Sequence, residues 1–250
     1  MSHEQRNILG VRLDAVSVEK ASEIVVRLSR EGHHYACAAN VHMIMEAYDD
    51  ASFRDVVNAA AIVVPDGKPL VWALRRLGEK HVERVTGSSL TIRVLEKAQA
   101  NGIGVGFYGG SETAMEMMIQ RVMRDFPHLS IAFAFSPPFK TLSDEEDRKI
   151  VDRIIESKTR ILFVGLGCPK QERWMALHKD QIPAVLIGVG AVFDFLAGTK
   201  PRAPQFLQEI GLEWLFRLAM EPRRLWRRYV IENPRFVAKF AGQLLGFHKY

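Results

Sequence analysis

The sequence predicts an α/β fold, in which a Rossmann-like, mostly parallel sheet is flanked by helices and followed by a basic, amphipathic helical appendage at the C-terminus. Three observations predict it. Short apolar runs alternate with amphipathic segments through the first 210 residues. Several runs are almost continuously apolar, which is typical of strands that helices cover on both faces. The last forty residues instead combine arginines with large aromatic side chains.

Six apolar runs have the length expected of strands. They span residues 34–39, 61–64, 103–108, 130–135, 160–165 and 184–188. Helical patterns separate them, most clearly over residues 17–29, 87–100, 112–126 and 143–157. A parallel sheet of this kind binds its ligands beyond the carboxyl ends of its strands. We therefore expect one α/β domain over residues 1–210, with its chemistry in the loops that follow the strands, and an appendage over residues 211–250.

Composition excludes several classes of protein. The chain has 250 residues, of which 48% are hydrophobic and 25% charged, as in an average globular protein. Its two cysteines, Cys37 and Cys168, cannot by themselves form a disulfide framework or a four-ligand zinc site, so a reducing compartment is expected. The N-terminus lacks a signal-peptide pattern, and the longest apolar stretch, residues 182–198, is too polar to span a membrane. These features predict a cytoplasmic protein.

The net charge of +5 lies entirely in the appendage. Residues 211–250 hold eight Lys and Arg against three Glu, whereas the charges of the first 210 residues balance. A helical apolar stripe runs through Phe236, Val237, Phe240, Ala241, Leu244 and Leu245. Basic and aromatic residues together fit an anionic membrane surface, plain packing against the core, or nucleic acid. We predict peripheral contact with the membrane and no nucleic-acid partner; the aromatic residues would equally suit a homo-oligomer interface.

Two polar residues follow the first two predicted strands. Asn40 stands where a helix should begin, and its side chain can cap that helix, contact a ligand, or do both. Asp66 belongs to a Pro-Asp-Gly sequence that is often no more than a turn. Placed at the mouth of a sheet beside buried apolar groups, however, a carboxylate can serve as a general base. Asp66 is therefore the candidate catalytic residue.

Two glycine turns are candidate ligand loops. Gly109 and Gly110 precede a helix that Ser111 can cap, a pattern typical of phosphate sites. The second loop reads GLGCPKQE over residues 165–172. In it, Gly167 permits a tight turn. The helix that follows carries a cation and two hydrogen-bonding side chains in its first turn, namely Lys170, Gln171 and Glu172. We predict ligand binding at both loops.

Several motifs are missing from the sequence. It contains no P-loop, no HExxH, no G-x-S-x-G, no Asp-x-Asp and no histidine cluster at metal spacing. We therefore expect no metal and no cofactor. Cys37 and Cys168 have no histidine beside them in the sequence and are expected to pack rather than to act as nucleophiles.

Eight blocks in order along the chain resemble the WecG/TagA/CpsF glycosyltransferases, known as glycosyltransferase family 26. They are Asn40, VVPDG at 63–67, ERVTG at 83–87, FYGG at 107–110, GLGCPKQE at 165–172, GVGAVFDFLAG at 188–198, RAP at 202–204 and GLEWLFRL at 211–218. The similarity extends from about residue 8 to about residue 228. PKQE followed by LEWLxR is a highly specific combination.

The resemblance implies an inverting, metal-independent transfer of a sugar from a UDP-sugar to a lipid-diphosphate-linked acceptor, at the inner face of the cell membrane. Relatives make teichoic acid linkage units, enterobacterial common antigen and exopolysaccharides. The family's proposed base falls on Asp66. Further family positions fall on Arg84, Gln171, Arg217, Arg224 and Arg227. Asp194, within the GVGAVFDFLAG block, is a further candidate substrate-binding residue. Some relatives carry Thr where this chain has Ala38, and the absent hydroxyl points to a different sugar.

Two other functions compete with this hypothesis. A nicotinamide-dependent oxidoreductase would need a glycine fingerprint after the first strand, with an acidic residue about twenty positions later. Glycines 104, 106 and 109 match the fingerprint only formally, because the first of them lie before and within the strand rather than after it. A nucleic-acid binder would use the basic appendage but would leave the PDG and PKQE loops unexplained.

Overall fold

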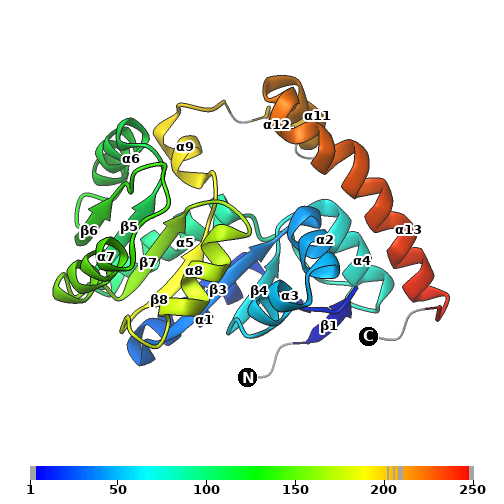
Figure 1. Ribbon diagram of the computed structural model, residues 1–250, viewed down its shortest axis with the longest axis horizontal. Helices are drawn as coiled ribbons and strands as arrows, with labels where there is room; N and C mark the ends of the chain where they lie inside the picture. Colours follow the sequence, from blue (N-terminus) through cyan, green and yellow to red (C-terminus); the bar gives the residue numbers. More distant parts are fainter. Residues whose placement is uncertain (1–3, 202, 205, 208–210, 248–250) are drawn as a thin grey trace.

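The computed structural model describes residues 4–201, 203–204, 206–207 and 211–247 (Figure 1). A six-stranded sheet forms its centre, with strand order β4-β3-β8-β7-β5-β6 and every pair parallel. The strands are β3 (His34–Ala39), β4 (Ile62–Pro65), β5 (Val105–Gly109), β6 (Ile131–Phe135), β7 (Ile161–Gly165) and β8 (Val185–Gly188). Each of the six predicted strands is present within two residues of its expected start, which confirms the predicted sheet.

Helices cover both faces of the sheet. One face packs against α1 (Val18–Glu31), α5 (Gly87–Ala100), α6 (Glu112–Asp125) and α9 (Val192–Ala197). The other packs against α2 (Val41–Asp49), α3 (Ala51–Asn58), α4 (Lys68–Arg76), α7 (Asp144–Glu156) and α8 (Lys170–His178). Along β3, for example, Cys37 faces the second group and Ala38 the first. This alternation explains the continuously apolar strands, since a residue of either parity meets a helix.

An antiparallel hairpin that the sequence pattern did not predict is formed by β1 (Gln5–Ile8) and β2 (Val11–Asp14). β1 is largely polar, so it gave no apolar run to detect. The buried Asp14 joins the hairpin to the sheet, because its carboxylate accepts the Val63 N–H at 2.6 Å.

The C-terminal helices are α11 (Glu213–Met220), α12 (Pro222–Trp226), the π-helical η1 (Arg227–Glu232) and α13 (Asn233–Leu244). We call residues 211–247 the appendage. The predicted boundary at residue 210 lies outside the described residues, as does Arg202 of the RAP block. Figure 1 shows α13 running past α2 and α4 toward β1.

The inner side of α13 packs firmly on the core. Phe236 and Phe240 are fully buried, and Phe240 meets the Trp72 ring of α4 edge-on at 5.7 Å between centroids. The Gln243 side chain accepts the Leu9 N–H at 2.8 Å, which ties α13 to the N-terminal hairpin. Packing of the appendage on the core is therefore confirmed.

The appendage also leaves large apolar side chains exposed. They are Trp214, Leu215, Met220, Trp226, Val230, Ile231, Val237, Leu244, Leu245 and Phe247. The predicted apolar stripe thus divides, with Phe236 and Phe240 inside and Val237, Leu244 and Leu245 outside. Among the described residues, no helix combines the length and apolarity required to cross a bilayer. Membrane contact stays a prediction.

Substituting Phe240→Ala should destabilise the protein by about 3–5 kcal/mol, because a fully buried aromatic ring leaves a cavity when it is truncated. Leu245→Ala on the exposed side of the same segment is the matched control and should change stability by less than about 0.5 kcal/mol. Urea denaturation measures both. Equal, small effects would show that α13 is not packed as described.

Candidate functional site

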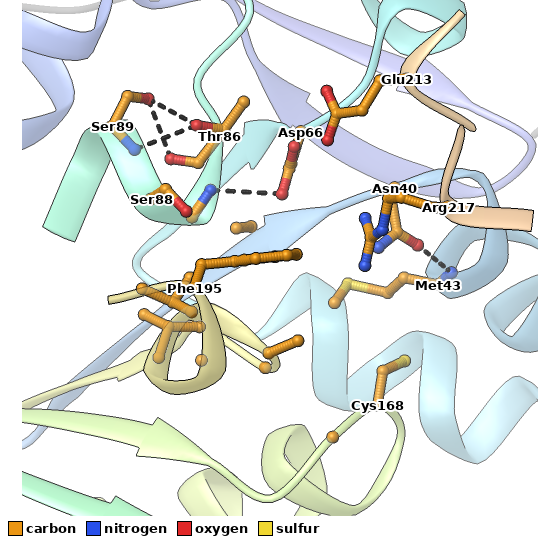
Figure 2. Close-up of a pocket in the computed structure, with 18 of the residues that line it drawn as sticks. Asn40, Met43, Asp66, Thr86, Ser88, Ser89, Cys168, Phe195, Glu213 and Arg217 are labelled. Atoms are coloured by element: carbon orange, nitrogen blue, oxygen red, sulfur yellow. Dashed lines mark hydrogen bonds between the residues drawn. The ribbon is translucent and has the colours of Figure 1, made fainter. Parts of the chain in front are cut away.

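The main cavity, of about 370 Å³, lies at the carboxyl edge of the sheet (Figure 2). Its walls come from the segments after four adjacent strands, β4, β3, β8 and β7, from the start of α5 and from the appendage. Seven of the thirteen predicted site residues line it: Asn40, Asp66, Arg84, Gly167, Gln171, Arg217 and Arg224. The cavity thus lies among the loops that follow the strands, where the site was expected.

Asp66 is held in place through its backbone and its side chain. The Asp66 N–H donates to Ala39 O at 2.7 Å, which fixes the turn after β4 against the end of β3. Asp66 Oδ2 accepts the Gly87 N–H at 3.2 Å, at the first turn of α5. Figure 2 shows this bond, with the carboxylate facing the space that Asn40 and Arg217 also border. The side chain is partly buried yet lines the cavity.

The environment of Asp66 favours a carboxyl that exchanges a proton near neutral pH. Burial raises its pKa from 3.8 to about 6, and the negative charge of Glu213 acts in the same direction. The Gly87 N–H and the Arg84 and Arg217 guanidinium groups act against this. Among the described residues, no cation lies within 4.0 Å of Asp66, since Arg84 pairs with Glu213 at 3.0 Å instead. Asp66 is therefore ionised at pH 7 and more basic than an ordinary carboxylate.

Asn40 is a helix cap and also lines the cavity. Its Oδ1 accepts the Met43 N–H at 3.1 Å and so begins α2, as predicted. The same residue borders the cavity beside Asp66, which leaves the predicted ligand contact open.

The loop after β7 is braced from within. Gln171 Oε1 accepts two backbone N–H groups, those of Gly167 and Gly190, each at 3.1 Å. Its Nε2 donates to Glu172 Oε1 at 2.6 Å. Gln171 thus joins the loops after β7 and β8, both of which line the cavity. The fully buried Glu172 and the exposed Lys170 line neither this cavity nor the one described below.

Gly109 and Gly110 also lie outside both cavities. Gly109 has φ +122°, and a Cβ there would come within 2.6 Å of the Gly165 carbonyl group. The Gly110 N–H donates to Gly165 O at 3.2 Å. These glycines allow the ends of β5 and β7 to approach closely, so they have a packing role of their own. The predicted anion site at this turn stays a prediction.

Asp194 likewise lies away from the cavity walls. Its carboxylate lies 3.1 Å from Lys200 Nζ, and Lys200 also pairs with Glu221 of the appendage at 3.2 Å. Asp194 therefore contributes to the connection between α9 and the appendage, and its predicted contact with substrate stays a prediction.

The appendage contributes three arginines to the cavity wall: Arg217, Arg224 and Arg228. The Arg217 guanidinium lies over the Phe195 ring, 5.4 Å from its centroid. Arg227 was expected here, but it is exposed and lines neither cavity, while its neighbour Arg228 lines both. Successive residues of a helix point in different directions, so only one of the two can face the site.

A smaller side cavity of about 150 Å³ also borders Asp66. The starts of α2 and α4 and the appendage enclose it, including the side chains of Lys68, Trp214 and Tyr229. Six residues line both cavities: Asn40, Asp66, Arg84, Glu213, Arg217 and Arg228. Asp66 therefore stands where the two cavities meet, accessible from each.

One group among the described residues could hold a metal ion. His42, Glu46 and Glu232 bring one ligand atom each to within 4.8 Å of one another. The sequence did not reveal this group because Glu232 comes from the appendage. In the structure His42 Nδ1 lies 2.9 Å from Glu232 Oε2, an ion pair or hydrogen bond that joins α2 to η1. Asp66 does not belong to this group.

The comparisons with known proteins agree with this geometry. The profile of the Glycosyl transferase WecG/TagA/CpsF family matches residues 6–250. The chain belongs to this family. It is 32% identical over 204 residues to an N-acetylglucosaminyldiphosphoundecaprenol N-acetyl-beta-D-mannosaminyltransferase of Bacillus spizizenii, covering 81% of this chain and 77% of the relative. An enzyme of the same name from Staphylococcus aureus strain MW2 is 29% identical over 239 residues, covering 94% and 91%.

This glycosyltransferase builds its cavity from segments that the sequence motifs had marked. The VVPDG block supplies Asp66, ERVTG supplies Arg84, PKQE supplies Gln171, and LEWLFR supplies Glu213 and Arg217. Membership of the family favours an enzyme over the nucleic-acid binder and a glycosyltransferase over the oxidoreductase.

Several wall residues of the glycosyltransferase were missed from the sequence. Thr86, Ser88 and Ser89 surround the N-terminus of α5, where Thr86 caps the helix by accepting the Ser89 N–H at 3.0 Å. A glycine with hydroxyl residues at a helix start was a detectable signal, but it does not directly follow a strand. Glu213 was not predicted either, because its partner Arg84 lies far away in the sequence.

Asp66→Asn should leave the enzyme folded and make it more stable than wild type above about pH 6. Ionisation of Asp66 is disfavoured in the folded state, whose pKa of about 6 exceeds the ordinary value of 3.8. The folded protein holds more protons than the unfolded chain between these values, so wild-type stability falls as pH rises through this window. The Asn side chain does not ionise, so the variant avoids this loss of stability. It still offers an oxygen to the Gly87 N–H.

Urea denaturation of wild type and Asp66→Asn across this pH range measures the effect. The difference in unfolding free energy should grow with pH and then level off above about pH 6. A variant that is no more stable than wild type at any pH would contradict the raised pKa.

Proposed function

We propose that this enzyme transfers a hexose or N-acetylhexosamine, or its uronate, from a UDP-sugar to a polyprenyl-diphosphate-linked saccharide. The transfer inverts the anomeric centre, requires no metal and belongs to the synthesis of bacterial exopolysaccharide or another cell-surface polysaccharide. One observation carries the proposal: Asp66 has no cation within 4.0 Å among the described residues, and it stands between two cavities bordered by arginines.

The relatives support the general chemistry. Their names describe transfer of N-acetylmannosamine to N-acetylglucosaminyldiphosphoundecaprenol, a sugar carried on a lipid diphosphate. Since the chain covers most of each relative, the same class of acceptor is the natural assignment here. The donor sugar of this chain need not be the same, because Ala38 lies on the wall of the main cavity and offers no hydroxyl.

The main cavity suits the donor. A UDP-sugar brings a diphosphate that gains negative charge as it departs. Arg217, Arg224 and Arg228 reach this wall from the appendage. The N-terminus of α5, with Ser88 and Ser89, provides a helix dipole and hydroxyl groups in addition. Such fixed charges and dipoles stabilise a leaving group without reorganising during the reaction.

The side cavity suits the acceptor sugar. An acceptor hydroxyl that enters there can reach both Asp66 and a donor in the main cavity, because Asp66 lines both cavities. The hydroxyl oxygen attacks the anomeric carbon and passes its proton to the Asp66 carboxylate. The bond between the anomeric carbon and the diphosphate oxygen breaks as the new bond forms, and UDP leaves with the electron pair. A single displacement of this kind inverts the anomeric configuration.

Membrane contact follows from the same arrangement. The acceptor carries a polyprenyl chain, and the appendage that borders the side cavity also exposes Trp226, Val230 and Leu245. Arginines lie among these apolar residues, as in interfacial helices that bind anionic lipid. We place the enzyme peripherally on the inner face of the cell membrane.

Asp66→Asn should lower turnover by at least about a hundredfold, because it removes the general base. Turnover is measured with a panel of UDP-sugars and a short-chain polyprenyl-diphosphate-linked sugar. Asp152→Asn, an exposed aspartate on α7, is the matched control and should keep wild-type activity. EDTA should leave wild-type turnover unchanged. Near-normal activity of Asp66→Asn would remove Asp66 from the base role, and loss with EDTA that manganese restores would overturn metal independence.

Replacing Trp226 and Leu245 together by Ala should weaken binding to vesicles that contain anionic lipid, since both side chains are exposed on the appendage. Flotation with liposomes measures the bound fraction. Phe139→Ala, which truncates an even more exposed aromatic residue outside the appendage, should bind as wild type does. Binding of wild type that is indifferent to lipid charge and salt would contradict the proposed surface.

A further inference from the structure

Glu213 occupies an unusual position for an acidic residue. It begins α11 and lines both cavities, in walls that also include Arg84, Arg217 and Arg228. A carboxylate beside a site for diphosphates opposes the binding of anions. Its presence there calls for a different role.

The ion pair between Glu213 and Arg84 indicates what this role is. Glu213 Oε2 lies 3.0 Å from Arg84 Nη2, although the two residues are 129 positions apart in the sequence. Arg84 is also close enough to Asp66 to lower its pKa. Two carboxylates therefore compete for one guanidinium group, and in the structure Glu213 holds it. Glu213 and Asp66 line the same two cavities, and the charge of Glu213 raises the pKa of Asp66; both side chains are labelled in Figure 2.

We propose that Glu213 is a positioning residue that holds Arg84 away from Asp66, so that the docked appendage keeps the base unpaired. This inference rests on the proposed role of Asp66. Without the Glu213 carboxylate, Arg84 would turn to Asp66, the other acidic residue on the described cavity walls, whose pKa Arg84 already lowers. An ion-paired Asp66 would be a weaker base, because the pair stabilises the charged form.

Other charged groups around Asp66 do not replace Glu213. Those on the walls of the two cavities are His42, Lys68, Arg84, Glu213, Arg217, Arg224 and Arg228. Glu213 is the only acidic residue in this set. It is therefore the described wall residue that can balance Arg84.

The appendage does not depend on Glu213 for its attachment. Phe236 and Phe240 are fully buried, and Arg235 makes a two-pronged ion pair with Asp49. A substitution at Glu213 that keeps its shape should thus leave the appendage docked and change the charge balance at Asp66 alone.

The test is a titration of the Asp66 carboxyl by ¹³C NMR in the full-length protein, with the resonance assigned by its loss in Asp66→Asn. Glu213→Gln should lower the Asp66 midpoint by about one pH unit or more. Turnover at pH 7 should fall about three- to tenfold, since the base is weaker. In Glu213→Asp, which keeps the negative charge, the Asp66 midpoint should stay closer to that of wild type. This variant supplies the comparison with wild type if Glu213→Gln does not fold.

Glu221→Gln is the matched control. Glu221 is an appendage carboxylate that pairs with Lys200 and Arg224 and lines neither cavity, so its loss should not move the Asp66 midpoint. An Asp66 midpoint that is unchanged or raised in Glu213→Gln would overturn the proposal, as would an equal shift in Glu221→Gln. The titration needs no turnover, so the outcome for Glu213 is distinct from a failure of the transferase assay.

Discussion

The Asp66 carboxylate accepts a hydrogen bond from the first turn of α5 while every guanidinium group near it is engaged elsewhere or more than 4.0 Å away, within the part of the chain that the structure describes. The rest of the site depends on this balance. The N–H of Gly87 orients the carboxylate, burial raises its pKa, and the lack of a paired cation keeps it basic. If an arginine lay closer, it would form an ion pair with Asp66, and the paired carboxylate would be a weaker base.

Two separate parts of the chain create this environment. The sheet supplies the turn after β4 and the loops after β3, β7 and β8. Gln171 joins the last two of these loops by accepting the N–H groups of Gly167 and Gly190. The appendage supplies Arg217, Arg224 and Arg228 to the cavity wall, where we propose that they meet the leaving group, and it supplies Glu213 as the ion-pair partner of Arg84. Since α13 is packed on the core through Phe236 and Phe240, the appendage forms a wall of the site as well as a candidate membrane surface.

The elements that depend on local pattern could be predicted from the sequence. All six strands of the sheet were found, because residues buried on both faces leave an apolar run, and Asn40 was recognised as a cap from its place before a helix. The hairpin at β1 and β2 was missed, since it pairs through its backbone and β1 is largely polar. Asp66 was found by its position after a strand.

Features that depend on long-range contacts were not predictable in this way. Whether Arg227 or Arg228 faces the cavity is decided by the rotation of a π-helical turn, which composition does not reveal. The role of Gly109 is clear only from its distance to Gly165. The pairing of Glu213 with Arg84 joins the appendage to a loop before α5, and neither residue is informative without the other.

The pH dependence of kcat/KM, with a UDP-sugar and a lipid-linked acceptor, tests the central claim most directly. If Asp66 is the base with a pKa of about 6, the wild-type rate should rise with pH along an acid limb centred near that value. The residual activity of Asp66→Asn should lack this limb. An identical limb in the variant, or a wild-type rate that stays flat down to about pH 4, would contradict the account.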